Sequence, residues 1–566
     1  MIDAIEADER EQDATGPRGG TRGVTATLTR LRDRFRRAPN DQGEFTVAPA
    51  AGAVVPEDVR RRLDPAIPGR RWVAWVSALV ITAIAALLRI VNLGFPPGRI
   101  FDEEYYATEG EELLHHMVEW RPDPDPNLPG YGDYVVHPPL GKWMIAAGIK
   151  LFQYDSFGWR FSSVVVGVAS VLMIIRIARR MFRSNVLGCT AGLLMAMDGM
   201  HLVLSRTAIL DIFVMFWVLA AFGFLVLDRD ARRKRWLRAM EKGLDPTDPS
   251  RSGRPRLGWS GVPWWRLAAA ASAGAACGVK WSGAFFIPAF LILIVIWEVG
   301  ARRSAGVTRP WRDTLIDESG WIVAFVVLVF GAYLATWTGW FISPDGWKRH
   351  WLNSMGQEEP FIFGALRNLW EYHREIYAFH AQLDDSHQYQ SWPWQWLLLA
   401  RPVAFYYNAD PNCGAASCSA EILLLGTPVL WWSFIPALLG VAWFGISRRD
   451  WRALPIWLMF AVGILPWFYY ELKHRTMFYF YIIPAEPFLI LAVVFVLGAL
   501  ISGPGVGRTR TFALPADDRR LYGTIFAGGY VLLVGLCFWW YYPLYVGWSI
   551  PYEDWLRHLL LGNRWV

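Results

Sequence analysis

The sequence predicts an all-α integral membrane protein with about eleven transmembrane helices. Apolar residues make up 54% of the 566 residues and charged residues only 19%. The apolar residues occur in long runs rather than in the one-sided stripes of soluble helices. Many runs reach the roughly 20 residues that a helix needs to cross a bilayer. Clusters of basic residues separate the runs in a regular order, which is the charge pattern of a multi-pass membrane protein.

Eleven apolar runs account for the predicted spans. They lie near 72–94, 159–182, 186–204, 209–227, 264–280, 282–300, 321–342, 422–446, 454–470, 477–501 and 521–542. Basic clusters lie at 176–183, 232–238, 302–303, 448–449 and 508–520. The positive-inside rule places each cluster in the cytoplasm, and eleven spans that begin inside satisfy all of them at once. The sequence therefore predicts a cytoplasmic N-terminus and an extracytoplasmic C-terminus in the cell membrane.

This topology divides the chain into four regions. They are a disordered cytoplasmic tail (1–70), an N-terminal transmembrane region (71–342) that contains a first external loop (95–158), a second external loop (343–421), and a C-terminal four-span region with its outer tail (422–566). The tail is polar, and residues 25–37 within it are equally compatible with a short basic helix on the membrane and with a solvated segment. Residues 141–152 are apolar but too short to span, which predicts a helix lying in the interface.

Composition argues against several other classes of protein. The net charge of +6 would suggest nucleic acid binding only if the basic residues shared one folded face, and here they lie in short loops between apolar runs. The five cysteines include one close pair, Cys413 and Cys418, so neither a disulfide framework nor a zinc ribbon is indicated. A small bridge between these two can persist outside the cytoplasm. No cleavable signal peptide is expected, because the first seventy residues are polar.

The first external loop contains the strongest candidates for chemistry. Asp102 and Glu103 follow a Pro-Pro-Gly stop just beyond the first span, at the start of an expected helix. Neighbouring carboxylates point in different directions, so one can act as a general base on a hydroxyl while the other binds it. The alternative is that both acids complement the helix dipole and face water. His137 and Lys142 close the loop around a rigid Pro-Pro turn, which a structural turn with a snorkelling lysine explains almost as well.

Two arginines near the outer interface are candidates for binding a phosphate. Arg206 lies in the link between two spans, where ionisable residues are costly unless they are paired or functional. A charge-assisted bond to a phosphate and an internal pair with Asp198 or Asp211 are equally supported. Arg475 ends a tight outer turn and can bind a specific lipid phosphate or anchor headgroups in general.

The second external loop combines aromatic, amide and imidazole side chains. Residues 387–396 could stack on a sugar or hold an extended peptide, although aromatic residues at an interface require no ligand. His380 and His387, with Asp384 and Asp385, match no strong metal-ligand spacing, so neither a metal nor another cofactor is expected. The sequence also has no glycine loop of the kind that cradles nucleotide phosphates.

Taken together, these motifs resemble the actinobacterial protein O-mannosyltransferases, members of the GT-C class of membrane glycosyltransferases. The resemblance extends from about residue 72 to the end of the chain. The matching segments are Asp102-Glu103, the His-Pro-Pro-Leu-Gly-Lys segment at 137–142, Ser205-Arg206 with Leu210-Asp211, Val279-Lys280-Trp281, the stretch 391–402, and Glu471 with Arg475.

The resemblance implies a GT-C bundle that transfers mannose, with inversion, from polyprenyl phosphate mannose to Ser/Thr hydroxyls of exported proteins. Asp102 would then take the hydroxyl proton, Glu103 would help to hold the acceptor, and Arg206 with Arg475 would hold the donor phosphate. His137 and Lys142 are further candidates for the donor site. Candidates for binding the acceptor or sugar are Glu104, Tyr106, His387, Tyr389 and Trp394. Membrane lipids and the export translocon are candidate partners. The second loop is too short for the β-trefoil domain that eukaryotic members carry.

Other functions remain open from the sequence. A GT-C enzyme could use a lipid, a cell-wall glycan or an asparagine side chain as acceptor. An asparagine-directed enzyme would be expected to bind a divalent cation and to carry a large C-terminal domain, whereas here about 24 residues follow the last apolar run. A transporter or flippase commonly shows related halves, and no internal repeat is evident. A nonenzymatic scaffold in the export machinery is a third alternative.

Overall fold

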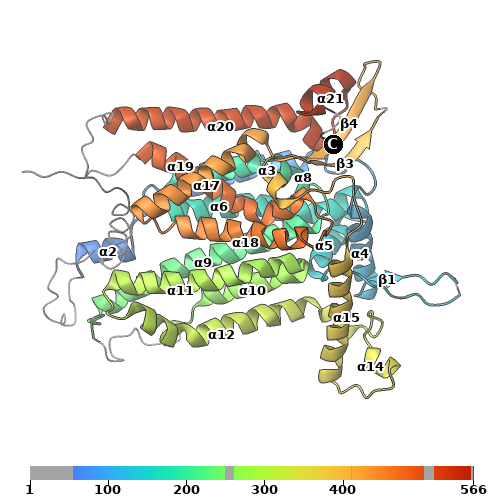
Figure 1. Cartoon of the computed structure of the whole chain (residues 1–566), viewed down its shortest axis with the longest axis horizontal. Helices are drawn as coiled ribbons and strands as arrows, with labels where there is room; N and C mark the ends of the chain where they lie inside the picture. Colours follow the sequence, from blue (N-terminus) through green and yellow to red (C-terminus); the bar gives the residue numbers. More distant parts are fainter. Residues whose placement is uncertain are drawn as a thin grey trace, which may run out of the picture.

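The computed structural model describes residues 55–125, 127–248, 261–409, 411–502, 516–562 and 565. Within these residues, nine helical segments are long and apolar enough to cross a membrane. They are α3 (Arg71–Ile90), α6 (Ser156–Phe182), α9 (Leu210–Glu241), η3 (Trp281–Phe286) continued by α11 (Ile287–Ala305), α12 (Pro310–Thr336), α17 (Pro428–Arg448), α18 (Ala453–Glu471), η4 (Tyr479–Ala485) continued by α19 (Glu486–Ser502), and α20 (Ala516–Val546). They run side by side as one elongated bundle (Figure 1).

The two remaining predicted spans form shorter helices. The run at 186–204 divides into α7 (Asn185–Ala196) and α8 (Gly199–Leu204), because Asp198 begins a new helix by accepting a bond from the backbone N–H of His201 at 3.0 Å. The run at 264–280 forms α10 (Trp264–Val279), which ends where Lys280 adopts an extended backbone. Every predicted apolar run is therefore helical, but in the described chain only nine reach the length of a span.

Elements of the two external loops gather at one end of the bundle (Figure 1). The first loop forms α4 (Glu103–His116), β1 (Trp120–Arg121), β2 (Tyr131–Gly132) and α5 (Leu140–Phe152). The second follows α13 (Thr338–Ile342) and forms α14 (Trp351–Ser354), α15 (Phe363–Gln382), α16 (Pro393–Trp396), β3 (Val403–Asn408) and the start of β4 (Cys418–Leu424). The chain continues after α20 into β5 (Ile550–Pro551) and α21 (Tyr552–His558) at the same end. Both loops therefore contribute to one surface.

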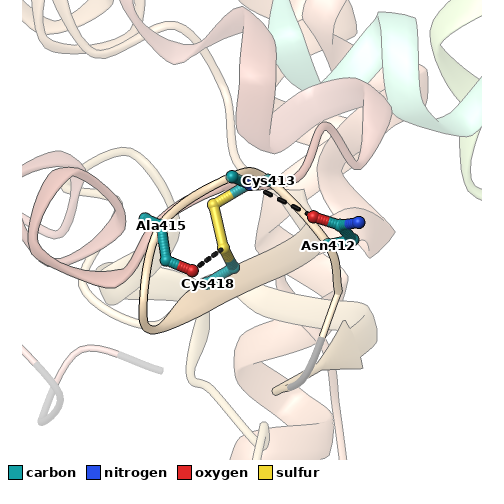
Figure 2. Close-up of a disulfide and its surroundings, with 5 residues drawn as sticks. Asn412, Cys413, Ala415 and Cys418 are labelled. Carbon is teal, nitrogen blue, oxygen red and sulfur yellow. Dashed lines mark hydrogen bonds between the residues drawn. A yellow bond between two sulfur atoms is a disulfide. The ribbon is translucent and has the colours of Figure 1, made fainter.

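A small antiparallel sheet and a disulfide bond shape this surface. β4 lies between β3 and β5, so the end of the chain is paired with the second loop. Cys413 and Cys418 form a disulfide bond in the connection from β3 to β4 (Figure 2). Beside it, the side chain of Asn412 accepts a bond from the backbone N–H of Gly414. The close cysteine pair of the sequence is thus a local bridge.

The predicted disordered tail needs one correction. Residues 57–63 form helix α2 (Glu57–Leu63), whose residues Val59 and Leu63 are four positions apart and share one face. That face is buried against Trp236 and Met240 of α9, which provides the apolar contact that the polar composition did not suggest. The segment 25–37 lies outside the described residues.

Buried charges join the transmembrane helices at the end of the bundle that carries α2. Arg266 of α10 pairs with Asp228 of α9 at 2.9 Å, with Glu298 of α11 at 2.7 Å and with Glu318 of α12 at 2.7 Å. All four side chains are buried. One guanidinium therefore joins four helices, and two of them, α9 and α10, carry Asp211 and Lys280 at their opposite ends.

We expect Arg266→Gln to lower the free energy of unfolding by about 3–5 kcal/mol, because it leaves the buried Asp228 without its ion-pair partner in the described chain and removes one of three arginines shared by Glu298 and Glu318. Chemical unfolding of the purified protein in detergent measures the change. Arg303→Gln is the control, because Arg303 is exposed on α11, and a change within about 0.5 kcal/mol is expected. Equal stability of the two variants would contradict the proposed role of Arg266.

Candidate functional site

Asp102 lies at the start of α4, where the first external loop meets the bundle. It is the N-cap residue of the helix, and it is half-buried. Burial raises the pKa of Asp102 to about 6, Lys280 opposes this rise, and Asp211 adds to it. A carboxyl group with this pKa is largely ionised at neutral pH and is a stronger proton acceptor than an ordinary aspartate.

The residue before Asp102 holds the backbone in an unusual conformation. Phe101 has φ 49°, in the left-handed region that side chains other than glycine rarely adopt. Its ring is stacked on Phe405 of β3 with 4.6 Å between centroids, and it meets the edges of Phe478 and Phe480 at 6.0 Å. These contacts stabilise the strained turn and fix the direction of the next side chain.

Lys280 and Asp211 form a buried ion pair close to Asp102. The Lys280 ammonium lies 3.1 and 3.2 Å from the two carboxylate oxygens of Asp211, and 4.3 Å from the ring centroid of Tyr481. Lys280 projects from the break between α10 and η3. Sequence reasoning noted Lys280 only as part of a family motif and did not assign it to the site. The sequence feature that could have identified it is a single lysine within an apolar run, because ionisable residues inside a membrane are usually functional.

A cavity of about 350 Å³ opens beside this lysine. Its lining residues come from the first external loop, from the break before η3 and η3 itself, from α15, and from α18 with the outer turn after it. They are His137, Lys280, Trp281, Ser282, Phe285, Tyr377, His380, Ala381, Trp467, Tyr469, Tyr470, Lys473 and Arg475. Three of these are cationic, six are aromatic, and none is a carboxylate. The cavity therefore fits an anionic group attached to a less polar body.

The predicted donor-site residues His137 and Arg475 meet in this cavity. The rings of His137 and His380 are stacked, with 5.1 Å between centroids. Nε2 of His380 lies 2.9 Å from the carbonyl oxygen of Val136, and its Nδ1 lies 3.3 Å from the Arg475 guanidinium. An imidazole that donates from Nε2 and accepts at Nδ1 satisfies both bonds.

Both histidines are uncharged near neutral pH. Burial, together with the Arg475 charge, lowers the pKa of His380 to about 4. Burial, together with Lys280 and His380, holds the pKa of His137 well below its usual value. The positive charge of the cavity therefore comes from its lysines and arginine.

Glu103 does not have the geometry expected of an acceptor-binding group. Its side chain is 0% exposed, and its carboxylate forms a two-point ion pair with Arg160 at 2.8 Å for each bond. The backbone N–H groups of Ile100 and Ala208 and the Trp159 indole also donate to it. Every acceptor direction is used inside the protein, so Glu103 positions the loop rather than contacting a ligand.

Arg206 likewise has a structural position in place of the expected phosphate contact. Its guanidinium donates to the carbonyl oxygens of Arg89 and Val91 at 2.8 Å and of Asn92 at 3.0 Å. These carbonyls end helix α3, where no further turn of helix can bond them. Arg206 is 6% exposed and caps α3. Of the two arginines that the sequence indicated, only Arg475 lines the cavity.

Lys142 is also occupied by internal partners. It is 0% exposed and forms ion pairs with Glu119 and, at 3.2 Å, with Glu109. Burial raises the pKa of Glu109 to about 7. This triad joins α4, α5 and the β1 end of the first loop, so Lys142 stabilises the loop and does not reach the cavity.

The candidates for acceptor or sugar binding fall into three groups. Tyr106 is buried with its ring 6.2 Å from that of His137, and the charge of Asp102 contributes to the rise of its pKa. His387 meets Phe101 at 6.4 Å between centroids and receives the backbone N–H of Tyr389 at 3.1 Å. His387 therefore lies beside the turn that carries Asp102, and Tyr389 is bonded to His387.

Glu104 and Trp394 make no such approach. Glu104 is exposed and pairs with Arg99 at 3.0 Å. Trp394 of α16 is 55% exposed and is not among the described residues that line the cavity. No three His, Cys, Asp or Glu side chains among the described residues are grouped so as to hold a metal ion.

Comparison with known proteins identifies the family. The model described as dolichyl-phosphate-mannose-protein mannosyltransferase matches residues 136–241, and the model described as the C-terminal four TMM region of protein-O-mannosyltransferase matches residues 365–565. The polyprenol-phosphate-mannose–protein mannosyltransferase of Mycolicibacterium smegmatis is 38% identical over 501 residues, which cover 86% of this chain and 92% of that protein. The protein of the same name from Corynebacterium glutamicum is 30% identical over 507 residues, covering 86% and 94%.

The fold agrees with a solved structure from yeast. The S. cerevisiae protein O-mannosyltransferase complex bound to the sugar donor superimposes with a TM-score of 0.64, covering 93% of this chain and 97% of that chain. The two are 13% identical, so this likeness supports the GT-C arrangement of helices and nothing finer. On the two family models and the curated relatives, this chain belongs to the protein O-mannosyltransferase family, an enzyme family of multi-pass membrane proteins.

Proposed function

We propose that this enzyme transfers mannose from polyprenol phosphate mannose to Ser/Thr hydroxyls of exported proteins, with inversion and with Asp102 as the general base. The observation that carries this proposal is the position of Lys280. It lines the cationic cavity and also influences the pKa of Asp102. A phosphate in the cavity and a hydroxyl beside Asp102 would therefore lie on either side of one residue. The mannosyl group would bridge them.

The cavity supports the donor half of the reaction. Arg475 and Lys280 supply charge-assisted bonds for the phosphate, and Lys473 adds a third cation at the mouth. The aromatic residues offer surfaces for a sugar ring and for the first isoprene units. Because the cations lie where the phosphate gains charge as it leaves, they stabilise the transition state more than the bound donor.

The chemistry is a single displacement at the anomeric carbon. The acceptor oxygen attacks this carbon while the bond from it to the phosphate oxygen breaks. The hydroxyl proton passes to Asp102, and polyprenol phosphate leaves with the bonding electron pair. Attack opposite to the leaving group inverts the configuration. Asp102 supplies the base, and the neutral histidines leave the charge of the phosphate to the lysines and arginine.

The arrangement of the loops supports an extracytoplasmic site. Both external loops and α21 lie at the end of the bundle that carries Asp102, and the arginine cluster 176–183 lies at the other end. On the positive-inside rule, we propose that the N-terminus is cytoplasmic and that the site lies at the extracytoplasmic face of the cell membrane. Acceptors would reach the site as exported, extended chains, so we propose that the export translocon delivers them. We also propose that membrane lipids surround the transmembrane bundle.

We expect Asp102→Asn to lower mannosyl transfer by about 10²–10⁴-fold, because general base catalysis commonly contributes that much. The assay uses reconstituted protein, labelled polyprenol phosphate mannose and a Ser/Thr-rich peptide. Glu111→Gln is the matched control, since it removes another carboxylate of α4 that pairs only with the exposed His115 in the described chain. Full activity of the Asp102 variant would remove this residue from the mechanism. Transfer to a lipid or glycan, and to no peptide, would reassign the acceptor.

We expect Arg475→Gln and Lys280→Gln each to lower kcat/KM for the donor by about 10–100-fold, because a hydrogen bond to a charged group contributes about 1.5–3 kcal/mol. Lys150→Gln is the control, since Lys150 is exposed on α5 and outside the cavity. Arg206→Gln should lower stability and leave the donor KM of the folded fraction unchanged. A larger donor effect at Arg206 than at Arg475 would contradict this assignment.

We expect kcat/KM to rise with pH through about 6 and then to level off, because a general base works in its ionised form. The two cavity histidines have lowered pKa values and stay neutral over this range. The rate is measured from about pH 5 to about pH 8. Glu421→Gln is the control, because burial raises the pKa of Glu421 to about 7 at a position bonded to Trp555. A flat profile, or one that Glu421→Gln shifts, would exclude Asp102 as the titrating group.

A further inference from the structure

A second and larger cavity lies at the opposite end of the bundle. Its volume is about 650 Å³, within the range of ligand sites. It is enclosed by the C-terminal end of α6, by α9, and by the segment from Leu63 to Arg71 that joins α2 to α3. Arg160 near the start of α6 binds Glu103, and Arg183 lies about 23 residues further on, roughly 35 Å along the helix axis. This cavity is therefore separate from the proposed mannosyl transfer site.

The lining of this cavity is strongly cationic. Of its sixteen residues, seven are Lys or Arg and two are Asp. Within the described chain, only Arg180, which pairs with Asp230 at 3.2 Å, and Lys234, which pairs with Asp64 at 3.2 Å, have a carboxylate partner. Five cationic side chains therefore share one space without a balancing acid, which favours an anionic ligand.

Two of these arginines have hydrogen-bonding capacity that the described residues do not use. One guanidinium nitrogen of Arg176 and one of Arg183 are buried and lack a hydrogen-bond partner in the described chain. Burying a charged donor without an acceptor is costly. A phosphate suits these two arginines, since a guanidinium and a phosphate match in charge and geometry.

Aromatic residues place the cavity at the depth of lipid headgroups. Arg176 lies over the ring of Trp75 at 3.9 Å, and Trp75 also lines the cavity. Trp72 and Trp75 are 62% and 46% exposed in the first turns of α3, a spanning helix. Tryptophan collects at the boundary between headgroups and hydrocarbon, and basic pockets between helices at this level bind phosphorylated headgroups.

We propose that the cavity bounded by Arg71, Arg176 and Arg183 binds the phosphate of an anionic lipid headgroup in the leaflet opposite to the mannosyl transfer site. The ligand would seat its phosphate between Arg176 and Arg183 and extend its acyl chains past Trp75. Such a lipid would also join α2 to α6 and α9, because residues of all three segments line the cavity. A free phosphate carries the same recognition chemistry, and the experiment separates the two sources.

The test measures lipid retention by native mass spectrometry of the full-length protein in detergent. The probes are phosphatidylinositol, phosphatidylcholine with the same acyl chains, and inorganic pyrophosphate. The site variant is Arg176→Gln with Arg183→Asn, since Arg183 has φ 53° and asparagine tolerates this left-handed conformation. The charge-matched control is Arg303→Gln with Arg309→Gln, two exposed arginines outside the cavity.

We expect wild type and control to prefer phosphatidylinositol over phosphatidylcholine, and the site variant to bind it about tenfold or more weakly, because two charge-assisted contacts are lost. Mannosyl transfer should stay unchanged in the site variant, which also shows that it folds. The single variant Arg176→Gln, which keeps the turn at Arg183, should show part of the loss. Pyrophosphate binding that needs the same arginines would support the phosphate site and assign it to a soluble anion. Equal lipid binding by wild type and site variant, or no binding of either phosphate probe, would overturn the proposal.

Discussion

The buried ion pair between Glu103 and Arg160 is the contact on which the candidate site depends. Both side chains are fully buried, and removing two charges from water is costly unless further hydrogen bonds satisfy them. Here they are satisfied, because Arg160 also donates to the carbonyl oxygens of Leu93, Pro96 and Gly98. The pair therefore holds the end of the first span, the turn after it and the start of α4 as one unit. Asp102 is adjacent to Glu103, so its position follows from this pair.

The sequence could not predict which of two similar residues faces the protein interior and which is available to a ligand. An acidic pair at a helix start indicates a base or a dipole contact, but only the packing of α6 shows that Glu103 faces inward to Arg160, while the charge of Lys280 in the cavity acts on Asp102. The same holds for Arg206 and Arg475. Both are basic residues near the outer interface, and the acceptors of Arg206 lie 114 to 117 positions earlier in the chain. Local pattern contains no information on such contacts.

The helical topology was predictable for a physical reason. Hydrocarbon offers no partner to a backbone N–H or C=O, so each spanning segment must be a long apolar helix that the sequence displays directly. The exceptions occur where side-chain bonds interrupt a run, as at Asp198, which receives the Trp431 indole at 2.7 Å, and at Lys280 with its Asp211 partner. Asp198 holds the start of α8 and the indole of Trp431, and Lys280 lines the cavity. The helix α2 was missed because its apolar face is only two residues wide and gains its stability from α9.

In the proposed mechanism, Lys280 would allow one site to hold a phosphate and a base without the charge of one cancelling the action of the other. If the Lys280 ammonium paired directly with Asp102, the carboxylate would be stabilised, its pKa would fall and its basicity would be lost. Instead Lys280 bonds to both oxygens of Asp211, so its charge is partly balanced and burial remains the dominant influence on Asp102. Arg475 and Lys473 then supply further positive charge to the cavity, where we propose that the phosphate binds. In the proposed mechanism, the Asp211 carboxylate would thus keep acid–base chemistry at Asp102 compatible with phosphate binding in the cavity.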